Sequence, residues 1–161
     1  MISLVRVDNR LIHGQVVSTW IPHLRADQVV VADEEAAASP LMRAAMSMAL
    51  PAHVATSILR MDEVDWPRLS AGPERVLVLV RDVADAAAAV RAGAQVEHLN
   101  LGNVHYADGR RPVSPSVFLS RQELVLLEAL ADAGVEVEAR AVPADRRVTL
   151  PEIASRIGAE D

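Results

Sequence analysis

Residues 4–20 read LVRVDNRLIHGQVVSTW, and this stretch predicts the start of an α/β fold. Its first part belongs to an apolar run, Ile2–Val7, expected to form a buried strand. Its last part carries apolar residues at helical spacing. A polar loop lies between them, over residues 8–15. The loops at the carboxyl ends of parallel strands form the ligand crevice of an open α/β sheet, so this loop is the first candidate for a functional site.

The same alternation of short apolar runs and helical segments continues along the chain. Arg75–Val80 contains VLVLV, which has no polar face and predicts a strand buried on both sides. Val135–Val142 alternates apolar and charged residues, with Glu136, Glu138 and Arg140 on one side. We therefore predict a half-exposed strand there, at a sheet edge. The remaining predicted strands are Gln28–Ala32, Val54–Leu59 and Val96–Leu101.

Cap residues predict where the helices begin and end. Ser39 and Pro40 start a helix on which Leu41, Ala45 and Met48 share one face. Trp66-Pro67 is interpreted as a helix end. The other predicted signals are Asp82 with Gly93, the capping box at Ser120 with Gly134, and Thr149 before a last short helix. We find no repeat, linker or break in composition, so residues 1–161 are predicted to be a single domain.

Composition narrows the class of protein. Only four of the 161 residues are aromatic, so the core must be built from aliphatic residues. There is no cysteine and no apolar run of the roughly 18 residues that a membrane span needs. The N-terminus has no signal-peptide pattern. A net charge of −6 argues against a nucleic-acid surface. These features predict a cytoplasmic protein without a metal or disulfide framework.

The loop holds an acid, an amide, an arginine and a histidine within six residues. A histidine at a helix N-terminus can carry a phosphoryl group, because the first backbone amides of the helix stabilise negative charge. Arg10 can donate charge-assisted hydrogen bonds to phosphoryl oxygens. Asp8 can orient the ring of His13 or hold Arg10 in place. Gly14 lets the backbone approach the phosphoryl group closely. Residue chemistry alone leaves open the alternative that His13 is an ordinary surface residue.

The run RVDNRLIHGQ, from Arg6 to Gln15, resembles the active-site signature of the IIB component of the mannose/fructose/sorbose family of the bacterial sugar phosphotransferase system. The resemblance extends over essentially the whole chain, through RVLVLVRD, LNLGN and EVEARAVPAD. It implies a three-layer α/β/α sandwich around a mostly parallel sheet. It also implies a protein-Nπ-phosphohistidine–sugar phosphotransferase that uses no metal, nucleotide or other cofactor.

The resemblance also assigns roles to residues. His13 matches the phosphorylated histidine, and Arg10 matches the arginine that binds the phosphoryl group. Arg6 and Asp8 match residues that support the loop, and Gln15 matches the glutamine after His-Gly. The implied donor is a phosphohistidine on the IIA component. The implied acceptor is a hexose-type sugar at the membrane components IIC and IID, so this chain meets the membrane only through protein partners.

Two positions depart from the family pattern. Asn9 stands where many members have Asp, a change that removes one negative charge near the site. Residues 102–106, which read GNVHY, replace a loop that often reads Gly-Gly-Met. Asn103 in that loop and Arg81 at the end of the central strand are further candidates for supporting the phosphate site.

Two other functions stay open at this point. The chain could be a regulatory phosphocarrier, in which phosphorylation of His13 controls binding to a partner and no sugar is phosphorylated. It could also be an anion-binding module with no transfer chemistry. The identity of the sugar and the oligomeric state cannot be read from the sequence.

Overall fold

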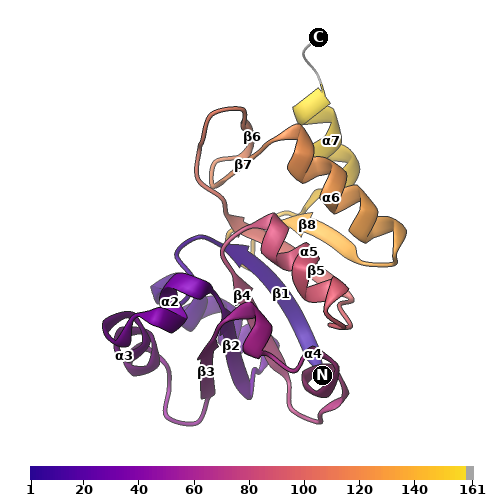
Figure 1. Cartoon of the computed structure of the whole chain (residues 1–161). Helices are drawn as coiled ribbons and strands as arrows, with labels where there is room; N and C mark the ends of the chain where they lie inside the picture. The colour runs from indigo at the N-terminus through magenta and orange to yellow at the C-terminus, as the bar shows by residue number, and fades with distance from the viewer. Residues whose placement is uncertain (159–161) are drawn as a thin grey trace.

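The computed structural model describes residues 1–158 as a seven-stranded sheet with helices on both faces (Figure 1). The strand order is β3-β2-β4-β1-β5-β8-β9. All neighbouring pairs are parallel except β8 and β9. The strands are β1 (Ile2–Asp8), β2 (Gln28–Ala32), β3 (Ala55–Leu59), β4 (Val76–Val80), β5 (His98–Asn103), β8 (Glu136–Ala139) and β9 (Val148–Thr149), with a separate hairpin of β6 (Arg111–Ser114) and β7 (Val117–Leu119).

The helices form two layers, one on each side of the sheet. The first layer comprises the π-helix η1 (Val16–Trp20), α1 (Ile21–Leu24), α2 (Glu34–Ala38) and α3 (Pro40–Ala49). The second comprises α4 (Trp66–Ala71), α5 (Val83–Arg91), α6 (Arg121–Asp132) and α7 (Leu150–Gly158), and a short 3₁₀ turn, η2 (Met61–Glu63), precedes α4. Figure 1 shows α2 and α3 on the opposite side of the sheet from α5 and α6. The predicted three-layer α/β/α sandwich is confirmed.

The core is aliphatic, as the composition requires. Every residue of β4 is buried, which confirms the prediction of a central strand covered on both faces. Side chains alternate across the sheet, so Val5 and Val78 pack with the α5–α7 layer, whereas Leu4 and Leu77 pack with the η1–α3 layer. No helix within residues 1–158 combines the length and the apolar character needed to cross a membrane.

Most predicted caps are confirmed. Asp82 accepts a hydrogen bond from the Asp85 backbone amide at the start of α5, and Ser120 forms the predicted capping box at the start of α6. Gly93 and Gly134 follow their helices with positive φ, the conformation that ends many helices. Thr149 directly precedes α7.

The predicted apolar face of α3 is wrong. Leu41 and Met48 are 79 % and 85 % exposed, whereas Met46 is buried and Met42 is partly buried. The helix carries apolar residues nearly all round, so the spacing of one subset did not identify the side that packs on the core.

Two further predictions need correction. Trp66-Pro67 begins a helix, because the Asp65 side chain caps α4 and proline fits its first turn. The strand predicted over residues 135–142 is the shorter β8, which pairs with a strand on each side, so β9 forms the sheet edge near the C-terminus. Glu138 is buried, because its face of β8 lies beneath the helix layer that contains Trp20.

One half-buried carboxyl group should make stability depend on pH. Burial, then the neighbouring carboxylates of Asp82 and Asp33, raise the pKa of Asp85 to about 6. The folded protein therefore holds this proton more tightly than the unfolded chain, and stability falls as pH rises from about 4 to about 6. We expect Asp85→Asn to raise the melting temperature at pH 8 and to leave it unchanged at pH 4.

Thermal unfolding followed by circular dichroism at both pH values checks this expectation. Asp132→Asn is the matched control, because Asp132 is an exposed carboxylate on α6. An equal effect of Asp85→Asn at both pH values would contradict the assigned cause.

Candidate active site at the end of the first strand

The loop after β1 is a tight turn anchored by two buried apolar side chains. The backbone amide of Leu11 donates to the carbonyl of Asp8 at 2.9 Å, which reverses the chain. Leu11 has a φ of 58°, a left-handed conformation that costs a non-glycine residue about 1–2 kcal/mol. Leu11 and Ile12 are both buried beneath the η1–α3 layer. Their burial offsets the backbone cost and fixes where His13 emerges.

His13 stands at the beginning of a continuous helical segment over residues 14–24. The carbonyl of His13 accepts a hydrogen bond from the backbone amide of Val17 at 3.1 Å, so the first turn begins at this residue. The first amides of a helix have no partner within the helix and favour a negative charge in front of them. The segment then widens into the π-helix η1, a form that is uncommon and often occurs beside functional sites.

The carboxylate of Asp8 is the hub of the site. It is fully buried, and its Oδ2 lies 2.8 Å from Nε2 of His13. The same oxygen accepts from Nε of Arg6 at 3.1 Å and from Nδ2 of Asn103 at 2.9 Å. The other oxygen, Oδ1, accepts from the backbone amide of Arg10 at 3.0 Å. One carboxylate thus joins the strand, the loop and the neighbouring strand β5.

These contacts keep Asp8 ionised. Burial alone would raise its pKa, but the hydrogen bond from His13, the charge of Arg6 and the hydrogen bond from Asn103 together hold the pKa below the ordinary value. A carboxylate only accepts hydrogen bonds, so Nε2 is the protonated ring nitrogen of neutral His13. Nδ1 then keeps its lone pair. The His13 side chain is 15 % exposed, so this ring is within reach of a reactant.

Arg6 is a fully buried cation beneath the loop. Its guanidinium pairs with Asp8 and also donates to Oδ1 of Asn100 at 2.6 Å and to the carbonyl of Arg140 at 3.2 Å. Burial lowers the pKa of Arg6, while the charge of Asp8 acts in the opposite direction. Its guanidinium lies 5.1 Å from the ring centre of Trp20, a cation–π contact. Arg6 therefore supports Asp8 from below and does not itself face a reactant.

The other predicted residues of the loop lie around this hub. The Arg10 side chain is exposed, and within residues 1–158 we see no hydrogen bond from its guanidinium. Gln15 Oε1 accepts from Nη2 of Arg6 at 3.4 Å. The Asn9 backbone amide donates to the carbonyl of Asn103 at 3.0 Å, and its buried Oδ1 has no partner among the described residues. A Cβ at Gly14 would meet nothing within 4 Å, so the space before the helix is open.

Both supporting candidates contact this loop. Asn103 donates to Asp8, as described above, and lies 3.5 Å from Oε1 of Gln15. Arg81 donates to the Asn9 carbonyl at 3.3 Å, but its guanidinium is also paired with Asp33 at 2.7 Å. The structure therefore brings all nine predicted residues to one place.

Sequence reasoning missed what surrounds Arg6. Gly102 lies so close that an added Cβ would stand 2.0 Å from Cζ of Arg6. Asn100 accepts a hydrogen bond from Arg6 and donates one to Glu138. Glu138 is buried, although it was predicted to be exposed. The signal that could have found Asn100 is a polar residue between two apolar ones, both leucines, inside a predicted strand.

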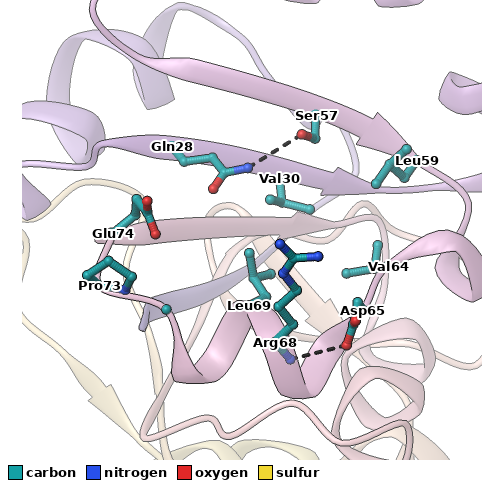
Figure 2. Close-up of a pocket in the computed structure, with 11 residues that line it drawn as sticks. Gln28, Val30, Ser57, Leu59, Val64, Asp65, Arg68, Leu69, Pro73 and Glu74 are labelled. Atoms are coloured by element: carbon teal, nitrogen blue, oxygen red, sulfur yellow. Dashed lines mark hydrogen bonds between the residues drawn. The ribbon is translucent and has the colours of Figure 1, made fainter.

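A separate pocket of about 580 Å³ lies away from His13, between α4 and strands β2 and β3. Figure 2 shows Arg68 and Leu69 of α4 facing Gln28 and Val30 of β2. None of the predicted site residues lines this pocket. The chemistry-bearing cluster is therefore the open loop at the end of β1 and not this cavity.

Comparison with known proteins places the whole described fold in one group. Residues 2–160 match the family model described as the PTS system sorbose subfamily IIB component. The chain is 33 % identical over 150 residues to the N-acetylgalactosamine-specific phosphotransferase enzyme IIB component 2 of Escherichia coli K12, covering 92 % of this chain and 96 % of that protein. It is 26 % identical to the mannose-specific EIIAB component of the same organism, covering 98 % of this chain and 49 % of that protein.

Solved structures agree with this grouping. The manxB structure from Thermoanaerobacter tengcongensis superposes with a TM-score of 0.88 at 27 % identity, covering 97 % of this chain and 96 % of that one. The IIBSor domain of the sorbose permease from Klebsiella pneumoniae superposes with a TM-score of 0.85 at 26 % identity, covering 96 % and 97 %.

The contact between Gly102 and Arg6 can be tested by adding one methyl group. Gly102→Ala forces the buried guanidinium to move, and overpacking of this kind costs about 1–3 kcal/mol. We expect the free energy of unfolding, measured by urea denaturation, to fall by that amount. Gly158→Ala is the control, because a Cβ there meets nothing within 4 Å. Wild-type stability of Gly102→Ala would show that Arg6 is not held as described.

Proposed function

This chain belongs to the sorbose-subfamily IIB components of the sugar phosphotransferase system, and we propose that His13 is the residue that carries its phosphoryl group. Membership of this family gives the chain a role in phosphoryl transfer within sugar uptake. The observation that supports His13 as the acceptor is the 2.8 Å contact between its Nε2 and the buried carboxylate of Asp8. That contact leaves Nδ1, the Nπ atom of the ring, as the nucleophile.

The first transfer takes a phosphoryl group from a phosphohistidine of the IIA component. The lone pair of Nδ1 attacks phosphorus as the bond between phosphorus and the donor nitrogen breaks, and the donor ring leaves with that electron pair. Asp8 stabilises the Nε2–H of His13 as positive charge builds on the ring. In phosphoryl transfer, catalysis consists mainly of such positioning and charge stabilisation, so the proposed step uses no cofactor.

The phosphorylated state brings negative charge to the front of the loop. The exposed guanidinium of Arg10 can form charge-assisted hydrogen bonds to phosphoryl oxygens. The first backbone amides of the helix after His13 stabilise the same charge. Gly14 contributes the open space in which these oxygens fit. Arg81 supports the side of the loop through its hydrogen bond to the Asn9 carbonyl, while its charge is paired with Asp33.

The second transfer passes the phosphoryl group to a sugar hydroxyl presented by the membrane components IIC and IID. The hydroxyl oxygen bonds to phosphorus, the bond to Nδ1 breaks, and the hydroxyl proton is released. The family role implies contact with IIA and with these membrane components. The relatives are named for different sugars, N-acetylgalactosamine, fructose and mannose, so we propose only a hexose-type sugar.

The proposed acceptor can be tested directly by phosphorylation in vitro. We expect one acid-labile phosphoryl group on the wild-type protein after incubation with phosphoenolpyruvate, the general phosphotransferase proteins and IIA, measured by intact mass. His13→Gln should not be labelled, whereas His53→Ala, which removes an exposed histidine elsewhere, should be labelled normally. NMR of the labelled protein should place the phosphoryl group on Nδ1.

A labelled His13→Gln variant, or a phosphoryl group on Nε2, would contradict the proposal. Adding membranes that contain IIC and IID together with candidate sugars then separates transport from regulation. Loss of the label with formation of sugar phosphate supports transport. Retention of the label with every sugar tested favours the regulatory phosphocarrier.

Arg10 should matter for rate and not for folding. A charge-assisted hydrogen bond contributes about 1.5–3 kcal/mol, which corresponds to a loss of about tenfold to a hundredfold in rate. We expect Arg10→Gln to slow phosphorylation of His13 by this factor with an unchanged melting temperature, measured by rapid-quench labelling. Arg43→Gln, at an exposed arginine on α3, is the matched control. Equal rates for both variants would remove Arg10 from the proposed phosphate site.

A further inference from the structure

We propose that Asn100 and Glu138 are positioning residues that fix the ring of His13 through Arg6 and Asp8. This inference rests on the proposed role of His13 as the phosphoryl acceptor. Neither residue lies in the loop, and neither touches the reacting nitrogen. They form a buried polar ladder with Arg6, defined here as Arg6, Asn100 and Glu138, that runs across three neighbouring strands.

The ladder follows from the strand register. Arg6 of β1 is the Cα partner of Asn100 in β5, and Asn100 is the partner of Glu138 in β8. Partners in adjacent strands point to the same face of a sheet, so the three side chains lie in a row. Arg6 and Asn100 are 0 % exposed and Glu138 is 6 % exposed.

Each member of the ladder determines the orientation of the next. Glu138 Oε1 accepts from Nδ2 of Asn100 at 2.9 Å, which fixes the amide so that its oxygen faces Arg6. That oxygen accepts from Nη1 of Arg6 at 2.6 Å. The opposite side of the guanidinium, Nε, then donates to Asp8 at 3.1 Å, and Asp8 holds Nε2 of His13. Four consecutive polar contacts therefore link Glu138 to the active ring.

The far end of the ladder is also connected to the helix that follows His13. Arg140 pairs with Glu138, and its carbonyl accepts from both Arg6 and Asn100 at 3.2 Å. Trp20, at the end of η1, has its ring 5.1 Å from the Arg6 guanidinium and 5.2 Å from that of Arg140. Its Nε1 donates to the carbonyl of Ala141 at 3.0 Å. The ladder thus contacts both the loop before the helix and the end of η1.

Stability alone does not account for a buried polar ladder. On the same face of the sheet, β2 and β4 place Val29, Val31, Leu77 and Leu79 beneath the helices. Replacing a buried ionic group by apolar residues of similar volume is often neutral or stabilising. The fully buried guanidinium of Arg6 instead requires a hydrogen-bond acceptor besides Asp8, and the ladder provides one in Asn100. Its role is therefore to hold Arg6 in one orientation.

The test combines the rate of His13 phosphorylation with an NMR measurement of which ring nitrogen of His13 carries the proton. Asn100→Leu keeps the branched shape and the number of heavy atoms of the side chain but removes both ladder contacts. We expect at least a tenfold loss in the maximal rate of His13 phosphorylation, with the KM for phosphorylated IIA unchanged, because Asn100 is fully buried and cannot contact IIA directly. In long-range proton–nitrogen NMR of the unphosphorylated protein, the single Nε2–H tautomer of wild-type His13 should become a mixture. His13→Gln identifies its signals among the five histidines.

Matched variants of β8 separate positioning from general damage to the strand. Glu138→Leu should behave like Asn100→Leu, and Glu138→Gln, which can still accept from Asn100, should restore the tautomer and most of the rate. Glu136→Leu is the control, because Glu136 lies on the same strand with a side chain 54 % exposed. If Asn100→Leu does not fold, the smaller polar variant Asn100→Ser carries the same expectation.

The outcomes separate this proposal from the proposed function. A folded Asn100 variant with wild-type rate and a single Nε2–H tautomer would overturn the positioning role. So would a tautomer mixture in Glu136→Leu equal to that in Glu138→Leu. If wild-type His13 accepts no phosphoryl group, the proposed function fails, but the tautomer measurement still decides whether the ladder fixes the ring.

Discussion

The buried ion pair between Arg6 and Asp8 is the constraint on which the site depends. Both side chains are fully excluded from solvent, and they come from the same strand, two residues apart. Leaving either charge without its partner would be strongly unfavourable, because an unpaired buried charge costs several kcal/mol. The pair therefore requires a donor set around Asp8, an acceptor set around Arg6 and a glycine where the guanidinium passes. The loop, the end of β5 and the middle of β8 supply these requirements.

The arrangement also explains how β8, two strands away from β1, contributes to the candidate site at the end of β1. Parallel strands bring residues of equal register side by side, so β1, β5 and β8 present their polar residues in a row although these are far apart in sequence. The helical segment that follows His13 then covers that row, and Trp20, the last residue of η1, contacts Arg6 and Arg140. The contacts that hold β1, β5, β8 and the helical segment together are therefore also the contacts that position the residues of the site.

Much of the fold and of the loop before His13 could be predicted from the sequence, because the residue patterns that indicate them are local. The VLVLV run, the capping box at Ser120 and the polar loop before His13 each indicate their structure within a few residues. The exposure of Glu138 and of the Leu41–Met48 face could not be predicted in this way, because alternation and spacing show which residues share a face but not what covers it. The β6–β7 hairpin, which carries Pro112 and Pro115 within or beside its strands, also lacked a clear strand pattern. Likewise, the roles of Asn100 and Gly102 follow only from their contacts with Arg6, which is nearly a hundred residues away in the sequence.

The tight passage of Arg6 past Gly102 has a consequence for how such a chain can change over time. A side chain at Gly102 would collide with the Arg6 guanidinium. Loss of Arg6 would leave the buried carboxylate of Asp8 without its cation. We therefore expect substitutions at the two positions to be coupled, because a change at either one alone destabilises the contacts beneath the loop. A site of this construction is expected to vary more at its exposed residues, such as Arg10, than in its buried interior, where changes must be coordinated.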